Sequence, residues 1–269
     1  MTFRITIAMQ KGGVGKSTTT INLAGAMSAR GHDVLVVDAD PQGGATLKMG
    51  LREEYRNSDY ALFDVLSDMG QLTYGDLDQL IVETDEFDMV PSHLKNFNLE
   101  KYLYSEAGGH EALRKAVDRL DADYDLILVD SPPNLGPLSD GALIASENVL
   151  FPSHPNTIAR DSLEILFDEI ETIEEKFDQY DIKTMGAVLN EVPSQGNVAR
   201  EVEEWFFDTF GEDYVFSVPE RDVVEHAIEF RTSIFQYDPE EAGYPWDADA
   251  QEDVMAAYDR IANYVEEFL

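Results

Sequence analysis

The stretch QKGGVGKSTTT, Gln10–Thr20, follows the apolar run FRITIAM, Phe3–Met9, and precedes a segment with helical periodicity. Glycines let a backbone bend so that its N–H groups turn toward an anion, and the amino end of a helix adds positive charge. A strand, a glycine-rich loop and a helix in this order predict a phosphate-binding loop. The predicted loop residues are Gly12, Gly13, Val14, Gly15, Lys16, Ser17 and Thr18.

Two of these residues carry chemistry of their own. Lys16 supplies a point charge for the β- and γ-phosphates of a nucleotide, and Ser17 offers an oxygen to Mg²⁺. The strict pattern G-x-x-x-x-G-K-[ST] needs a glycine where this chain has Gln10. It does not need Lys11, which is either an incidental solvent lysine or a second functional cation. The order of strand, loop and helix favours the second interpretation.

Apolar, β-branched runs alternate with helical patterns along the rest of the chain. The expected strands are 3–9, 33–40, 80–84, 87–92, 125–133, 147–153, 182–192 and 214–219. The expected helices are 16–30, 61–66, 110–120, 158–177, 198–210, 222–230 and 248–269. This alternation predicts an α/β three-layer sandwich, a mostly parallel sheet with helices on both faces. Because no linker or repeat interrupts it, we expect a single domain over residues 1–269.

Polar segments follow four of the expected strands, and carboxyl ends of parallel strands meet at one edge of a sheet. The phosphate loop follows the first strand, and DADPQGG ends the second with Asp38 and Asp40. Asp130 ends the strand LILVD, an arrangement that holds Mg²⁺ in P-loop proteins. NEVPSQG begins with Asn190. A strand-end Asp, Asn or Pro can also be plain turn chemistry, as the Asp40–Pro41 step illustrates.

Together, KGGVGKST, DADPQGG and DSPPN resemble the ParA/MinD family of deviant Walker A P-loop ATPases. The resemblance implies ATP or ADP and Mg²⁺ as cofactors, and a dimer in which Lys11 reaches the partner's phosphates. By the same resemblance Asp40 positions or activates the attacking water, and Asp38 supports the magnesium shell or its own loop. Asn190 and Pro219 correspond to base-contacting positions. The implied catalytic residues are Lys11, Lys16 and Asp40, and the implied metal residues are Ser17, Asp40 and Asp130.

Composition removes several classes of protein. The chain has no cysteine, which excludes disulfides, cysteine zinc sites and iron–sulfur clusters. We expect a cytoplasmic protein without membrane contact, since no signal-like or bilayer-length apolar run occurs and the last helix is acidic. The formal net charge is −35. That charge predicts a protein from a halophile, because molar salt screens such self-repulsion.

Within the family the chain most resembles the ParA/Soj partition ATPases. This implies slow ATP hydrolysis, a homodimer formed on ATP, non-specific DNA binding, a nucleoid location and a ParB-like stimulating partner. The acidic surface leaves isolated arginines and a lysine for DNA contact, namely Arg200, Arg221, Arg231 and Lys183. Two alternatives stay open. One is a MinD-like or other nucleotide-switched scaffold without direct DNA binding. The other is a synthetase-like relative, such as dethiobiotin synthetase, against which Lys11 argues.

Overall fold

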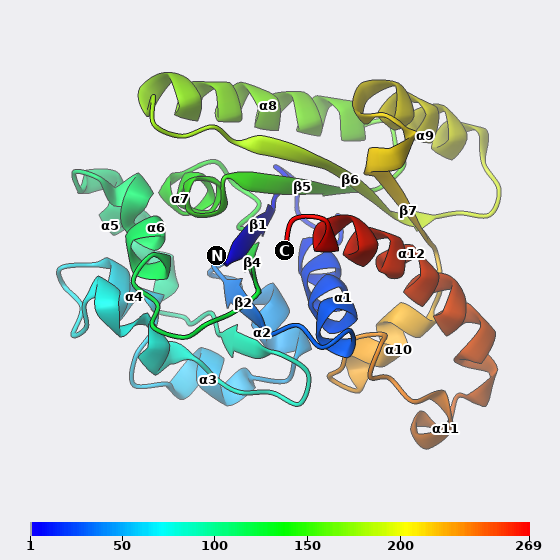
Figure 1. Cartoon of the computed structure of the whole chain (residues 1–269), viewed down its shortest axis with the longest axis horizontal. Helices are drawn as coiled ribbons and strands as arrows, with labels where there is room; N and C mark the ends of the chain where they lie inside the picture. The colour runs from blue at the N-terminus through cyan, green and yellow to red at the C-terminus, as the bar shows by residue number, and fades with distance from the viewer. Residues whose placement is uncertain (1) are drawn as a thin grey trace.

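The computed structural model describes residues 2–269 and has one seven-stranded sheet at its centre (Figure 1). Every pair of neighbouring strands in this sheet is parallel, in the order β3-β2-β4-β1-β5-β6-β7. The strands are β1 Phe3–Ile7, β2 Val34–Asp38, β3 Asp88–Val90, β4 Leu126–Asp130, β5 Asn148–Ser153, β6 Lys183–Val192 and β7 Val215–Pro219.

Helices connect the strands and cover both faces of the sheet. They are α1 Lys16–Ala29, α2 Gly44–Lys48, α3 Arg52–Asn57, α4 Leu62–Leu66, α5 Asn96–Ser105, α6 Ala112–Val117, α7 Pro137–Ser146, α8 Ala159–Lys176, α9 Asn197–Phe210, α10 Val223–Glu229, α11 Pro239–Ala242 and α12 Ala248–Glu266. Short 3-10 turns occur at Tyr74–Leu80, Gly109–Glu111, Glu212–Tyr214 and Pro245–Asp247. The predicted three-layer α/β sandwich is confirmed.

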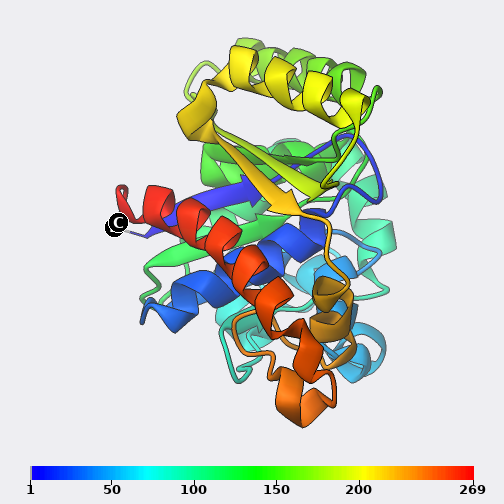
Figure 2. The same cartoon turned by 90° about the vertical axis from the view of Figure 1, so that its right-hand side faces the viewer.

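Successive residues of a strand point to opposite faces of the sheet. Because both faces are covered by helices, the strands are apolar along most of their length. Val34 and Val36 of β2 join the core under α1 and α12, whereas Leu35 and Val37 join the core under α4–α7. A third core lies beneath α8 and α9. Side chains alternate across a strand, so a sheet covered on both faces needs apolar residues at every position. Figure 2 shows α9 and α12 on opposite sides of β7.

The C-terminal helix α12 lies along α1 and β7 and buries its apolar face there (Figure 1). Tyr258 and Ile261 are buried in the shared core, and each such side chain stabilises the fold by about 1.5–3 kcal/mol. Arg30, which follows α1 directly, pairs with Asp259 and Glu266 of α12 at 2.8 Å each. The expected helix 248–269 is therefore a packed element of the domain. Among residues 2–269, no helix is both long and apolar enough to cross a bilayer.

One expected strand is wrong. Residues 80–84 form no strand of the sheet, and only Val82 makes an isolated antiparallel bridge, to Met89. The chain turns at once after this bridge, since Thr84 Oγ1 donates to the carbonyl of Phe87 at 2.6 Å. The second expected strand of this region shortens to Asp88–Val90, which pairs with β2. Among residues 2–269, five helices occur that periodicity did not indicate: the short helices α2, α3 and α11, and the ten-residue helices α5 and α7.

A cluster of ionisable groups links α7 to α8. Asp140 of α7 is buried, and its Oδ2 lies 2.8 Å from His110 Nδ1. Burial and the neighbouring Asp140 carboxyl raise the pKa of Glu169, on α8, to about 7, against the opposing effects of His110 and Lys176. Since the folded state holds a proton that the unfolded chain releases near pH 4.5, this group stabilises the fold most at low pH.

We therefore expect the contribution of Glu169 to the free energy of unfolding to decline as pH rises from about 5 through 7. Glu169→Gln keeps a neutral hydrogen-bonding group, so the decline should be shallower in that variant. Urea unfolding at several pH values measures the difference, with the exposed Glu171→Gln on the same helix as control. Parallel pH profiles for wild type and Glu169→Gln would contradict this expectation.

Candidate functional site

The polar strand ends meet at one edge of the sheet, as expected from the sequence. Ile7, the last residue of β1, is in register with Asp130, the last residue of β4. Asp130 is in turn in register with Asp38, the last residue of β2. Ser131 Oγ donates to the carbonyl of Ile7 at 3.0 Å, which ties the segment after β4 to the start of the phosphate loop.

The loop between β1 and α1 has the backbone of an anion cradle. Gly13 and Gly15 have φ angles of 74° and 88°, in the left-handed region that glycine adopts without strain. A side chain at Gly15 would also collide with the amide of Asn190. Asn190 Nδ2 donates to the carbonyl of Val14 and to Thr19 Oγ1, both at 3.0 Å. The end of β6 therefore holds the loop in place.

Lys16 lies inside this loop and is only 7% exposed. Its Nζ donates to the backbone carbonyl of Lys11 at 3.0 Å, so the loop curls around the ammonium group. Burial lowers the pKa of Lys16, while the nearby Asp130 and Asp40 carboxylates raise it. The site thus places one desolvated cation between two carboxylates, where a phosphate and a divalent ion would both find partners.

Lys11 has a different environment. It lies at the outer bend of the loop and is partly exposed. Within residues 2–269 its side chain makes no hydrogen bond or ion pair, whereas its carbonyl holds Lys16. The side chain is therefore not needed to hold its own loop, and its ammonium is accessible to an anion on a second molecule.

Asp40 and Asp38 occupy different environments although they are two residues apart. Asp40, nearly buried, accepts a hydrogen bond from the Gln42 N–H at 2.9 Å, and burial raises its pKa. Its carbonyl accepts from Ser92 Oγ at 2.6 Å, which fixes the turn. Asp38 Oδ2 accepts from the N–H and hydroxyl of Thr46 at 2.8 and 2.6 Å. Asp38 therefore supports the loop, whereas Asp40 lies close enough to Lys16 for each to shift the pKa of the other.

Asp130 is fully buried, and neither of its oxygens accepts a hydrogen bond within the described part of the chain. Burial raises its pKa to about 6, against the nearby Ser17 hydroxyl and Lys16, which lower it. Two unpaired buried oxygens beside a serine hydroxyl fit a divalent cation. No group of three or more His, Cys, Asp or Glu side chains within residues 2–269 could chelate a metal. Such a cation would take its other ligands from phosphates and water.

A cavity of about 570 Å³ opens beside the loop. Asn190 and Pro219 line it from the ends of β6 and β7. Gly13, Gly15 and Thr18 line it from the loop side. Lys48, which sequence reasoning missed, also lines it and donates from Nζ to Thr18 Oγ1 at 2.6 Å. The only sequence signal for Lys48 is its place just after DADPQGG, since nothing in its spacing indicates a contact with Thr18.

The basic residues considered for DNA contact do not form one patch. Lys183 begins β6 at the amino edge of the sheet, whereas Arg200, Arg221 and Arg231 follow the carboxyl ends of β6 and β7. Arg221 pairs with Asp253 at 2.7 Å, and Arg231 donates to the carbonyl of Leu47 at 3.1 Å. Arg200, Arg231 and Lys183 are exposed, and within residues 2–269 none of the three forms an ion pair.

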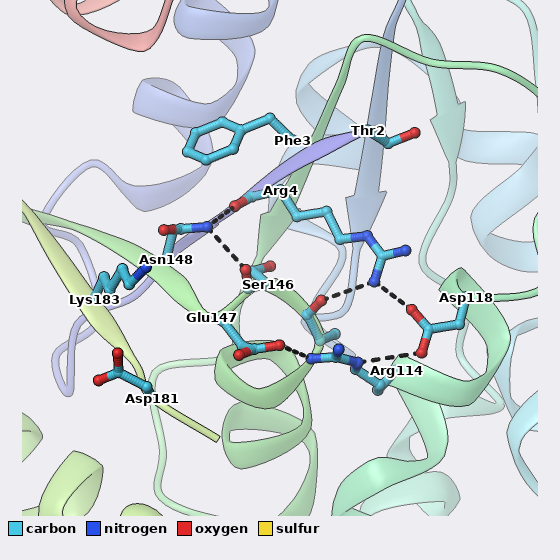
Figure 3. A pocket seen from close by; sticks show the side chains of 11 residues that line it. Thr2, Phe3, Arg4, Arg114, Asp118, Ser146, Glu147, Asn148, Asp181 and Lys183 are labelled. Atoms are coloured by element: carbon cyan, nitrogen blue, oxygen red, sulfur yellow. Dashed lines mark hydrogen bonds and ion pairs between the residues drawn. The ribbon is translucent and has the colours of Figure 1, made fainter. Parts of the chain in front are cut away.

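Another cavity, of about 440 Å³, lies at the amino edge of the sheet, away from the phosphate loop (Figure 3). Its two arginines are already neutralised. Arg4 pairs with Asp118 at 2.6 Å, and Arg114 pairs with both Asp118 and Glu147. Because both arginines are paired with carboxylates, Lys183 is the one cation of this described lining without an ion pair, and the cavity offers less to an anion than the loop does.

Comparison with known proteins identifies a matching family model and similar ATPases. A family model described as an AAA domain matches residues 2–183. The chromosome-partitioning ATPase Soj of Thermus thermophilus is 33% identical over 255 residues, which cover 94% of this chain and 95% of Soj.

Two solved structures share the fold. Cobyrinic acid a,c-diamide synthase from Mycobacterium smegmatis, with bound ADP and magnesium, has a TM-score of 0.71 at 27% identity, over 86% of this chain and 93% of that one. An ATP complex of McdA from Cyanothece has a TM-score of 0.79 at 22% identity, over 97% and 96% of the two chains. At that identity, the McdA likeness concerns the fold alone.

Proposed function

The chain belongs to the ParA/MinD family of P-loop ATPases, and from that premise we propose that it is an ATP-driven partition or positioning switch. It binds MgATP, forms a homodimer around the nucleotide, hydrolyses ATP slowly and is stimulated by a ParB-like partner. The observation that carries the proposal is the convergence of Lys16, Asp40 and Asp130 beside the loop, which also carries the partly exposed Lys11.

Each residue has a defined task in this proposal. The loop from Gly12 to Thr18 holds the phosphates through backbone N–H groups, and Lys16 neutralises them. Ser17 and Asp130 hold Mg²⁺ with help from Asp40, and when bound the ion offsets charge on the transferred phosphoryl group. Asp40 orients the attacking water. Asn190 and Pro219 hold the base. The amide nitrogen of Asn190 already donates to Val14 and Thr19, so its amide oxygen would accept a hydrogen bond from the base.

Exposed apolar side chains support a dimer that meets at the same edge. Leu94 and Phe97 follow β3, Leu135 follows β4 and Ile158 follows β5, each at least 42% exposed. These side chains lie after the carboxyl ends of strands, the end that carries the nucleotide residues. A second copy docked there would bury them and would bring its Lys11 toward the phosphates.

DNA binding is a separate component of the proposal. Non-specific DNA binding relies on lysines and arginines that release counterions, and it weakens steeply with salt. The chain carries a net charge of −35. Of the four candidate cations, Arg221 is ion-paired, Arg231 donates to a backbone carbonyl and Lys183 lies at the opposite edge of the sheet. This observation favours the second candidate, a nucleotide-switched scaffold that binds a protein partner and not DNA.

A salt titration of DNA binding separates the two candidates. For the partition ATPase, we expect binding with ATP that is lost with ADP and in Lys16→Ala, and that weakens as salt rises. Fluorescence anisotropy of labelled duplex DNA measures it from low to molar salt, since halophilic origin stays a prediction. If ATP changes DNA binding at no salt concentration, the scaffold candidate replaces the partition ATPase.

A further inference from the structure

Lys48, the last residue of α2, places another cation of this chain at the nucleotide cavity. Its Nζ donates to Thr18 Oγ1 at 2.6 Å, and both residues line the cavity of about 570 Å³. Thr18 lies in the first turn of α1, which carries no acidic residue. The hydroxyl and the ammonium therefore face the same space from two different helices.

The environment of Lys48 is unusual for a lysine in so acidic a chain. Its side chain is half-buried, and within residues 2–269 no carboxylate lies within ion-pair distance of Nζ. Arg4, Arg30 and Arg221, by contrast, each pair with a carboxylate. A desolvated ammonium is costly unless an anion compensates it. Burial lowers the pKa of Lys48, and Asp130 and Glu191 raise it without forming an ion pair with Lys48, so an anionic ligand in the cavity would be its direct partner.

The residues that line the cavity indicate the group. Asn190 and Pro219, the proposed base-binding residues, line the same cavity as Thr18 and Lys48. Lys16, which neutralises the far phosphates in the proposed function, lies inside the loop and outside this lining. We propose that Lys48, supported by Thr18, binds the α-phosphate of the nucleotide, the phosphate that adjoins the ribose. This assignment rests on the proposed function.

A contact with the α-phosphate is present in ATP and in ADP alike. An interaction that is equally strong in both ligands adds affinity without favouring the transition state. Lys48 should therefore tighten the binding of both nucleotides by the same factor and leave kcat unchanged. This separates it from Lys11, whose proposed role concerns the transferred phosphoryl group alone.

The test compares wild type with Lys48→Met by calorimetric titration of the full chain with MgATP, ADP and adenosine. We expect ATP and ADP to bind about ten- to hundredfold more weakly, by a common factor. Adenosine, which has no phosphate, should bind equally to both proteins and so reports an intact cavity. The kcat at saturating ATP should stay within about twofold. Lys183→Met, at the opposite edge of the sheet, is the matched control.

The outcomes distinguish a failure of the Lys48 assignment from a failure of the proposed function. Unchanged ADP affinity in Lys48→Met, or a loss confined to ATP, would overturn the assignment while leaving the proposed function intact. A wild-type protein that binds neither nucleotide would overturn both. Lys48→Gln, which keeps a donor for Thr18, is a second variant should the methionine protein misfold, and we expect it to lose the same affinity for ATP and ADP.

Discussion

Lys11→Ala should lower the kcat of ATP hydrolysis about a thousandfold, the scale on which a cation supplied to a transferring phosphoryl group acts. MgATP affinity should stay within about threefold of wild type. The structure gives a reason for this separation. Only the backbone carbonyl of Lys11 holds Lys16, and alanine retains that carbonyl, so the phosphate loop keeps its shape.

Steady-state phosphate release and nucleotide titration measure the two quantities separately. Lys16→Ala should lose both binding and turnover, because Lys16 lies buried within the loop. Lys101→Ala, an exposed lysine on α5, should change neither. Wild-type turnover in Lys11→Ala would refute a catalytic role for the second lysine of the loop.

Asp40→Asn has the second-largest expected effect, a fall in kcat of about a hundred- to ten-thousandfold, as for loss of a group that orients or deprotonates water. Asparagine retains an oxygen that accepts from the Gln42 N–H, and the backbone carbonyl still accepts from Ser92. The turn should therefore persist and ATP should still bind. Light scattering should show an ATP-dependent dimer that outlasts the wild-type dimer, which decays as ATP is consumed. A variant that hydrolyses ATP at the wild-type rate would remove Asp40 from the mechanism.

Mixing the two inactive variants tests whether Lys11 acts across the dimer. In a mixed dimer, one site combines an intact Asp40 in its own subunit with an intact Lys11 from the partner. Random pairing should restore about a quarter of wild-type turnover. No recovery on mixing, with dimers still present by light scattering, would place Lys11 in its own subunit's site.

The sequence predicted the strands well because a sheet covered on both faces leaves a strong local signal. Every residue of β2 and β4 is buried, and both appear as unbroken apolar runs. Complete burial also explains why α7 was not predicted from the sequence. All ten of its residues are buried, so PLSDGALIAS shows no polar face and no helical period that could be recognised. The prediction of a strand over 80–84 was wrong because a run of so few apolar residues has no periodicity that distinguishes a strand from a turn.

The identity of the phosphate loop is a local property. A strand, glycines with positive φ, a lysine and a hydroxyl must be adjacent in the chain, so QKGGVGKSTTT contains nearly all that a P-loop needs. The strand-end residues Asp40 and Asp130 were also predictable, because parallel strands carry their carboxyl ends to one edge.

Contacts between distant segments could be decided only by the tertiary structure. Register brings Asp38 beside Asp130. Thr46 donates hydrogen bonds to Asp38, whereas Asp40 lies close enough to Lys16 to interact with its charge. Packing of α2 against α1 brings Lys48 to Thr18, thirty residues away in sequence. Such pairings depend on how helices dock onto a shared sheet, and neither side chain carries a local pattern that reveals its partner.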